Sequence, residues 1–250
     1  MTIEELIKAR PFLEDAFRAY EKVLKFRKCT SHKWEAPVDE KAAIYPIRSV
    51  DLIFRCFSSV FDLPEDTLVP LKEAMKSGQI DLSRLPLNEA PAFSLPYGED
   101  EIAPLLFLSS KPFFLRLKDR YPLDDRSWEK GMCPVCNSRP SLASINQEGG
   151  RSLYCSYCGT RGSFRRSGCP LCLTTHTQNI TLLTAEGEDG FRLDACDSCG
   201  SYVKTIQARL LDDLSPDLAD IVSMPLDVIA QGRGYRRLSP NPIGLMRIGC

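Results

Sequence analysis

Residues 131–140 read GMCPVCNSRP, residues 154–160 read YCSYCGT, residues 169–172 read CPLC and residues 195–204 read ACDSCGSYVK. Each stretch holds two cysteines separated by two residues, a spacing that lets one tight turn point both sulfurs at the same ion. In order, the pairs form C-x2-C-x18-C-x2-C and then C-x2-C-x23-C-x2-C, and each long spacer can hold a β-hairpin. The sequence therefore predicts two tetrahedral sites, with the ligands Cys133, Cys136, Cys155 and Cys158 in the first and Cys169, Cys172, Cys196 and Cys199 in the second.

The residue after each pair indicates how its turn is built. Asn137, Gly159 and Gly200 follow the first, second and fourth pairs, and Asn and Gly tolerate the left-handed backbone conformation that aims N–H groups at sulfur. Leu173 follows the third pair, and a leucine disfavours that conformation. We therefore expect the third turn to be less regular.

Four thiolates around one ion leave no open coordination position. Tetrahedral sulfur suits both Zn²⁺ and a single rubredoxin-like iron, so the ligands do not decide the metal. A closed site has no place for an activated water, and the chain contains no G-x-S-x-G, P-loop or H-E-x-x-H motif. We therefore expect two metal ions per chain, iron or zinc, in a protein that is not an enzyme. His32 and His176 are expected to be surface residues, because two complete sets of four cysteines leave no vacancy.

Such sites add negative charge that needs compensation, about −2 for each four-thiolate site with a divalent ion. Arg161, Arg165 and Arg166 lie between the second and third pairs and Lys204 follows the fourth, so we expect them to offset it. Phosphate binding by the arginines is the alternative. The formal net charge of −1 disfavours a general nucleic-acid surface.

Three cysteines stand outside the pairs. The first residues lack the basic and apolar regions of a signal peptide, and no run of apolar residues is long enough to span a membrane. We therefore expect a cytoplasmic protein without membrane insertion, in which thiols stay reduced. Cys29 and Cys56 are predicted to be free, buried apolar residues, and Cys250 to be mobile.

The N-terminal half is predicted to be a helical domain spanning residues 1–130. Thr2 and Glu5 form a capping box, and apolar residues recur at helical spacing after Pro11. Further helices are predicted over 47–61, 65–77, 102–109 and 112–120, with an ordered loop over 82–98, where three prolines fall. The apolar residues that recur along one face of each predicted helix are interpreted as the core of a helical bundle.

The remainder, residues 131–250, is predicted to be a tandem four-cysteine domain with a C-terminal helix and tail. Short β-like runs and paired cysteines begin close to residues 128–131. A helix over 218–230 should break or kink at Pro225, and residues 232–242 read as an irregular tail. The fold class is thus α+β, with a helical bundle followed by two rubredoxin-like or zinc-ribbon modules and a helix.

The order of the four pairs, with Tyr202 and Lys204 after the last, resembles the formate dehydrogenase accessory protein family. Trp128, the helix that begins near Pro216 and Gly234-Tyr-Arg-Arg continue the resemblance, which covers about half the chain well. The chain has Arg161-Gly162-Ser163 where the family usually has an acidic-Trp-His stretch. Many members also have Gly after the first pair, where Asn137 stands here.

The resemblance implies a non-catalytic maturation factor made in the cytoplasm. Such a factor binds the catalytic subunit of a respiratory formate dehydrogenase before assembly or export, and the metal associated with the family is iron in rubredoxin-like sites. We expect Arg166, Asp197, Tyr202 and Lys204 to contribute to the partner-binding surface, because they combine charge with an amphipathic aromatic ring. A structural role for Tyr202 is the alternative.

Two other classes of function compete with this one. A nucleic-acid-binding zinc-ribbon protein is disfavoured by the neutral charge. A small redox carrier that uses rubredoxin-type iron would depend on how deeply the metals are buried. The sequence leaves open whether the protein forms a homodimer.

Overall fold

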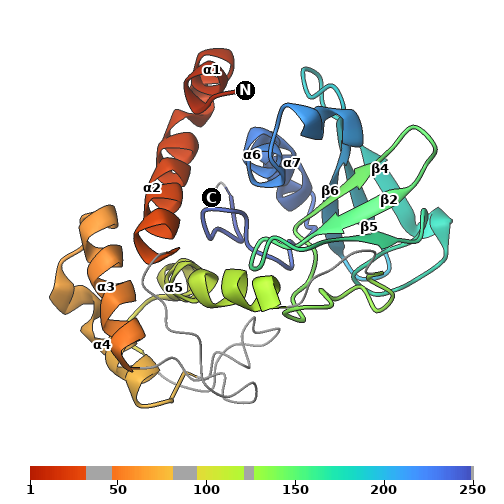
Figure 1. Ribbon diagram of the computed structural model, residues 1–250. Helices are drawn as coiled ribbons and strands as arrows, with labels where there is room; N and C mark the ends of the chain where they lie inside the picture. The colour runs from red at the N-terminus through yellow and green to blue at the C-terminus, as the bar shows by residue number, and fades with distance from the viewer. Residues whose placement is uncertain (32–46, 81–94, 121–126, 249–250) are drawn as a thin grey trace.

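The computed structural model describes residues 1–31, 47–80, 95–120 and 127–248 (Figure 1). Helices form the N-terminal part, and a six-stranded sheet with two short helices forms the remainder. The expected α+β class, with its helical region, two four-cysteine clusters and C-terminal helix, is confirmed. The division at residues 130 and 131 stays a prediction. The 82–94 part of the predicted loop, His32 and Cys250 lie outside the described residues.

Prolines and caps set most boundaries of the N-terminal helices. Thr2 and Glu5 form the predicted capping box, and a short 3-10 turn begins at Pro11. The helices here are α1 (Ile3–Ala9), η1 (Pro11–Leu13), α2 (Glu14–Ser31), α3 (Ile47–Phe61), α4 (Glu65–Lys76) and α5 (Glu99–Arg120). None of the described helices is long and apolar enough to cross a membrane.

Helix α5 corrects the prediction of two helices over 102–109 and 112–120. It is one helix with Pro104 and Pro112 inside it. An interior proline removes one backbone hydrogen bond and costs about 3 kcal/mol. Phe107 and Phe114 are each 1% exposed, and burying one such ring stabilises by about 1.5–3 kcal/mol. Packing on both sides of Pro112 therefore keeps the helix continuous.

The sheet joins two copies of the same three-stranded unit. Its strand order is β3-β2-β1-β6-β5-β4, and neighbours are antiparallel except for the parallel pair β1 and β6. Each unit runs as cysteine turn, strand, strand, cysteine turn, strand. The predicted tandem modules thus share one continuous sheet. Its strands are β1 (Leu142–Ile145), β2 (Arg151–Tyr154), β3 (Arg161–Phe164), β4 (Ile180–Leu183), β5 (Phe191–Cys196) and β6 (Ser201–Gln207).

The C-terminal segment packs back onto the second unit. The expected break at Pro225 is confirmed, because α6 (Pro216–Val222) and α7 (Met224–Gly232) meet at Ser223. Figure 1 shows both helices between α2 and the sheet. The tail that follows is irregular but fixed, since Tyr202 N–H donates to the carbonyl of Arg236 at 3.2 Å and Asn241 is fully buried. Two short 3-10 turns, η3 (Thr177–Asn179) and η4 (Ala208–Asp212), complete this part.

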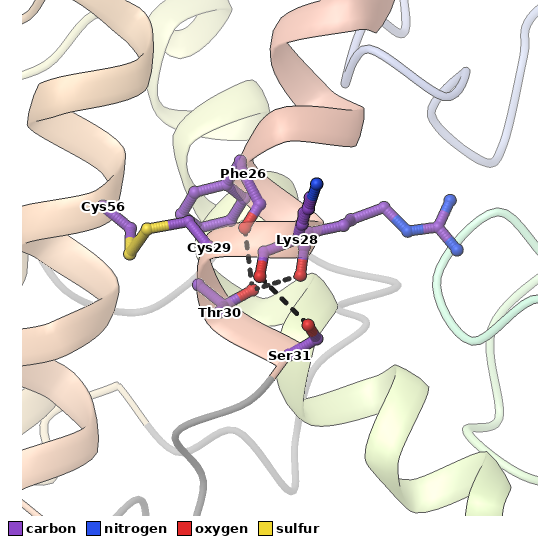
Figure 2. The surroundings of a disulfide bond; sticks show 7 residues. Phe26, Lys28, Cys29, Thr30, Ser31 and Cys56 are labelled. Atoms are coloured by element: carbon purple, nitrogen blue, oxygen red, sulfur yellow. Dashed lines mark hydrogen bonds between the residues drawn. A yellow bond between two sulfur atoms is a disulfide. The ribbon is translucent and has the colours of Figure 1, made fainter.

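The prediction that Cys29 and Cys56 are free thiols is wrong. They form a disulfide between α2 and α3, with Cα atoms 6.0 Å apart (Figure 2). The adjacent rings of Phe26 and Phe57 pack edge to face with centroids 5.3 Å apart. This packing sets the helix–helix distance, so each cysteine faces the other across the same contact. Sequence spacing carries no sign of that contact.

Candidate metal centres

The eight paired cysteines form two clusters of four. Within each cluster the sulfur atoms all lie within 4.8 Å of one another, and the grouping is the one that the order of the pairs predicts. Bonds of about 2.3 Å to a tetrahedral ion place sulfurs about 3.8 Å apart, and the Sγ–Sγ distances of 3.5 Å (Cys133–Cys158) and 3.9 Å (Cys169–Cys199) are close to that value. The arrangement therefore fits one zinc or iron ion per cluster. We name them the first site (Cys133, Cys136, Cys155, Cys158) and the second site (Cys169, Cys172, Cys196, Cys199).

Each pair lies on a turn closed by backbone hydrogen bonds. The N–H of the first cysteine donates to the carbonyl five residues later in three turns, at 2.8 Å for Cys133, 3.0 Å for Cys155 and 3.0 Å for Cys169. Backbone N–H groups also point at sulfur, as from Leu171 to Cys169 Sγ at 3.3 Å. We refer to residues 133–138, 155–160, 169–174 and 196–201 as the first to fourth cysteine turns.

The third turn repeats the geometry of the others, so the prediction that it is less regular is wrong. Leu173 has φ +64°, beside +61° at Asn137, +69° at Gly159 and +64° at Gly200. A left-handed conformation costs a residue with a Cβ atom roughly 1–2 kcal/mol. The tetrahedral arrangement of sulfurs requires the turn, and the surrounding hydrogen bonds hold Leu173 in it.

The two units meet through a close backbone contact. Gly131 has φ +62°, and a Cβ atom there would lie 1.8 Å from the carbonyl oxygen of Pro170 in the third turn. The guanidinium of Arg139 donates to the carbonyl of Leu171 at 3.1 Å. Only glycine at position 131 permits this approach, which fixes the first site relative to the second.

A hydroxyl residue occupies the last position of every cysteine turn, a pattern that the sequence analysis missed. Ser138, Thr160, Thr174 and Ser201 each follow the second cysteine of a pair by two residues. In the first site Ser138 Oγ lies 2.9 Å from Cys155 Sγ, and Thr160 Oγ1 lies 2.9 Å from Cys158 Sγ. In the second site Thr174 accepts from the N–H of His176, and Ser201 donates to the carbonyl of Cys199. Hydroxyl hydrogen bonds stabilise thiolates, so the repeated Ser or Thr was the available signal.

Burial differs between the two sites. All four sulfur ligands of the first site are buried, whereas Cys172 is exposed and Cys199 is half-buried in the second. Burial raises the pKa of the Cys136 thiol, while hydrogen bonds with Cys136 and Cys155 lower the pKa of Cys133. Thiolates of this kind are held in charged form by the ion they bind.

The arginines near the sites have local partners. The Arg165 guanidinium donates to the carbonyl of Thr174 at 3.1 Å and stacks on Phe164 at 5.2 Å. Arg161 lies over the ring of Tyr154 at 5.6 Å, and Arg166 is exposed beside the turn at Gly149. Arg165 thus places positive charge on the third turn, while Arg161 begins β3 and Arg166 lies in the bend that follows it.

Tyr202 and Lys204 are not surface residues, so that part of the partner-binding prediction is wrong. They are 3% and 1% exposed, because alternate side chains of β6 point under α6 and α7. Lys204 Nζ lies 2.6 Å from Asp220 and 2.5 Å from Asp227, and the Tyr202 hydroxyl donates to Asp227 at 2.7 Å.

Arg237, from the tail, completes this buried charge cluster with contacts of 2.5 Å to Asp220 and 2.9 Å to Asp227. Two cations and two carboxylates balance there, as a buried cluster requires. The expected role of Lys204 in offsetting the thiolate charge is therefore replaced by pairing with these aspartates.

Asp197 and His176, unlike Tyr202 and Lys204, are exposed on the surface. Asp197 is exposed in the fourth turn and accepts hydrogen bonds from Tyr235 at 2.5 Å and Thr181 at 3.0 Å. His176 is exposed, as predicted, with its ring beside Gln178. The contribution of Asp197 and Arg166 to a partner-binding surface stays a prediction.

Residues 168–243 match the family model of the C-terminal domain of FdhE. The chain is 32% identical over 138 residues to a protein FdhE homolog of Aquifex aeolicus, covering 54% of this chain and 49% of that one. It is 30% identical over 118 residues to a homolog from Stutzerimonas stutzeri, covering 45% and 38%. The matched region spans about half the length of these curated relatives or less.

The fold has a solved counterpart. The crystal structure of the FdhE protein from Pseudomonas aeruginosa matches with a TM-score of 0.68 at 20% identity, over 99% of this chain and 94% of that one. The similarity therefore extends through the helical N-terminal part, where the sequence resemblance is loose.

Proposed function

We propose that this chain is a formate dehydrogenase accessory protein that acts by binding, because its sequence is similar to that of FdhE proteins. It is not itself a catalyst. It holds two metal ions through its eight paired cysteines and acts in the cytoplasm on the catalytic subunit of a respiratory formate dehydrogenase, before assembly or export. The match of residues 168–243 to the FdhE C-terminal domain carries this proposal.

The geometry supports a binding role. Four thiolates per ion leave no coordination position for water or substrate, so the ions serve to fix the cysteine turns. When bound, zinc would supply only structural cross-links, whereas iron could also accept or donate an electron. The cysteine turns, the Gly131–Pro170 contact and the buried charge cluster hold the sheet unit in one arrangement. A preformed surface of this kind binds a partner with little ordering cost.

The direct test is recovery of the partner from the native organism. The full chain with an affinity tag should co-purify with the formate dehydrogenase catalytic subunit, identified by mass spectrometry. Deleting the gene should lower formate dehydrogenase activity while the catalytic-subunit transcript is unchanged. Full activity in the deletion strain, together with no recovered subunit, would contradict the proposal.

The predicted surface residues can be tested in the same experiment. Arg166→Glu combined with Asp197→Ala should reduce recovery of the subunit without loss of metal. Lys25→Glu is the control for the Arg166→Glu change, because it reverses the charge of an exposed residue of α2 in the same way. Equal recovery with all variants would remove these two residues from the interface.

The competing functions differ in what the structure offers them. Nucleic-acid binding stays disfavoured by the formal net charge of −1, and Arg161 and Arg165 also contact aromatic rings and backbone carbonyls of this chain. One observation favours a redox carrier. Cys172 is exposed, so an electron-transfer partner could approach an iron ion in the second site. That function requires iron, since zinc has no redox chemistry. Zinc without iron in elemental analysis of anaerobically purified protein would exclude a redox carrier.

A further inference from the structure

We infer that the two metal sites are unequal: the first is a closed structural site, and the second exchanges its metal with external thiol or chelating ligands. This inference rests on the proposed binding of one ion at each site.

The first site is covered from two directions. Tyr157, within the second turn, packs between Phe107 and Phe114 of α5 with ring centroids 4.8 Å and 5.4 Å away. The ammonium of Lys118 donates to the carbonyl of Gly159 at 3.1 Å. From the tail, Ser239 hydrogen-bonds Ser156 at 3.1 Å. These contacts cover the second turn, and all four cysteines of the first site are buried, so we expect an external ligand to reach them after α5 or the tail separates from this turn.

Among the residues that the structure describes, neither α5 nor the tail covers the third turn of the second site in this way. Cys172 is exposed, and the next residue, Leu173, is 38% exposed. In the fourth turn Asp197 and Ser198 are exposed and Cys199 is half-buried. The same four-thiolate chemistry is thus open on the Cys172 side in one unit and closed in the other.

Hydrogen bonding to sulfur adds to the difference. Two hydroxyls contact ligand sulfurs in the first site at 2.9 Å, whereas the corresponding hydroxyls of the second site bond to backbone groups. A sulfur of the first site that moves away from the ion must also break the hydrogen bond that it makes with Ser138 or Thr160. Leaving is therefore easier for a sulfur of the second site.

The exchange is a ligand substitution without electron transfer. With an ion bound, an external thiolate or chelator would form a bond to it as the Cys172 sulfur leaves, and a proton from water would balance the charge on the freed sulfur. Three further substitutions release the ion. Local opening at the first site must come before the same steps there, so its exchange follows the slower opening of the α5 contact.

The experiment uses the full chain with its metal content measured first. Protein holding two ions per chain is mixed with a chromophoric chelator, and release is followed by absorbance. We expect two phases of one equivalent each, the faster by about tenfold or more. Protein trapped after the first phase and treated with N-ethylmaleimide should be labelled at Cys169, Cys172, Cys196 and Cys199, while the first-site cysteines stay protected.

One variant tests the α5 contact over the first site without changing the cysteine ligands. Tyr157→Ala opens the α5 contact without removing a ligand, so it should accelerate the slow phase and leave the fast phase unchanged, which makes the fast phase its internal control. Two ions released at one rate, or labelling of the first site before the second, would overturn the inference while leaving metal binding intact. A content of one ion or none would overturn the proposed metal binding itself, and the inference with it.

Discussion

The disulfide between Cys29 and Cys56 should contribute measurably to the stability of the helical part. It links residues 27 positions apart in the sequence. In the chain-entropy account, closing a loop of that length removes enough freedom from the unfolded chain to stabilise by about 3.5 kcal/mol. Reducing the wild-type bond should lower the free energy of unfolding by that order.

The assay is urea unfolding followed by helical circular dichroism, with and without a phosphine reductant. Cys56 is buried, so replacing it also creates a cavity whose cost is unrelated to the cross-link. The double variant Cys29→Ala/Cys56→Ala isolates the bond, because its stability should not respond to reductant. The same control shows whether reductant disturbs the metal sites.

The quantity that decides the matter is the effect of reductant on the wild type minus its effect on the double variant. Alkylation and mass spectrometry must first show that the bond is formed in the untreated wild type. A difference near zero in protein with a formed bond would refute the loop-closure reasoning. It would mean that residual structure already restricts this segment in the unfolded chain.

Three further predictions address the packing around the sites. Gly131→Ala should destabilise the fold by several kcal/mol, because its Cβ would lie 1.8 Å from the Pro170 carbonyl oxygen and strained backbone alone costs about 1–3 kcal/mol. Gly187→Ala is the control, because Gly187 has φ +76° with nothing within 4 Å of the added Cβ. Equal melting temperatures of the two variants would contradict the Gly131–Pro170 contact. Lys204→Met should cost roughly 3–5 kcal/mol by leaving Asp220 and Asp227 with one cation, and chemical unfolding that shows no loss would argue against a buried charge cluster. Burial lowers the pKa of Lys111 below its ordinary 10.5, so the unfolded chain binds more protons and stability should rise with pH between the lowered value and 10.5. Lys111→Met should therefore be more stable than wild type near neutral pH, with an advantage that shrinks as pH approaches 10.5, and a constant difference would show that Lys111 does not titrate in this way.

Features that depend on neighbours in the chain could be predicted from the sequence. The spacing of the cysteine pairs decided which four sulfurs meet, because each pair sits on one short turn and the two turns of a site flank one hairpin. Prolines and caps likewise located the start of α3 and the break between α6 and α7. The resemblance to the FdhE family also followed from these local motifs.

Features that depend on contacts across the fold could not be predicted. The Cys29–Cys56 bond, the continuity of α5 through Pro112 and the burial of Tyr202 and Lys204 each follow from packing between segments distant in sequence. Leu173 adopts a left-handed turn because the whole site requires it, against its own preference. The inequality of the two sites has the same origin, since α5 and the tail cover the first site and nothing equivalent in the described residues covers Cys172. Local spacing decides which four sulfurs form one site, whereas only the tertiary structure decides which site solvent can reach.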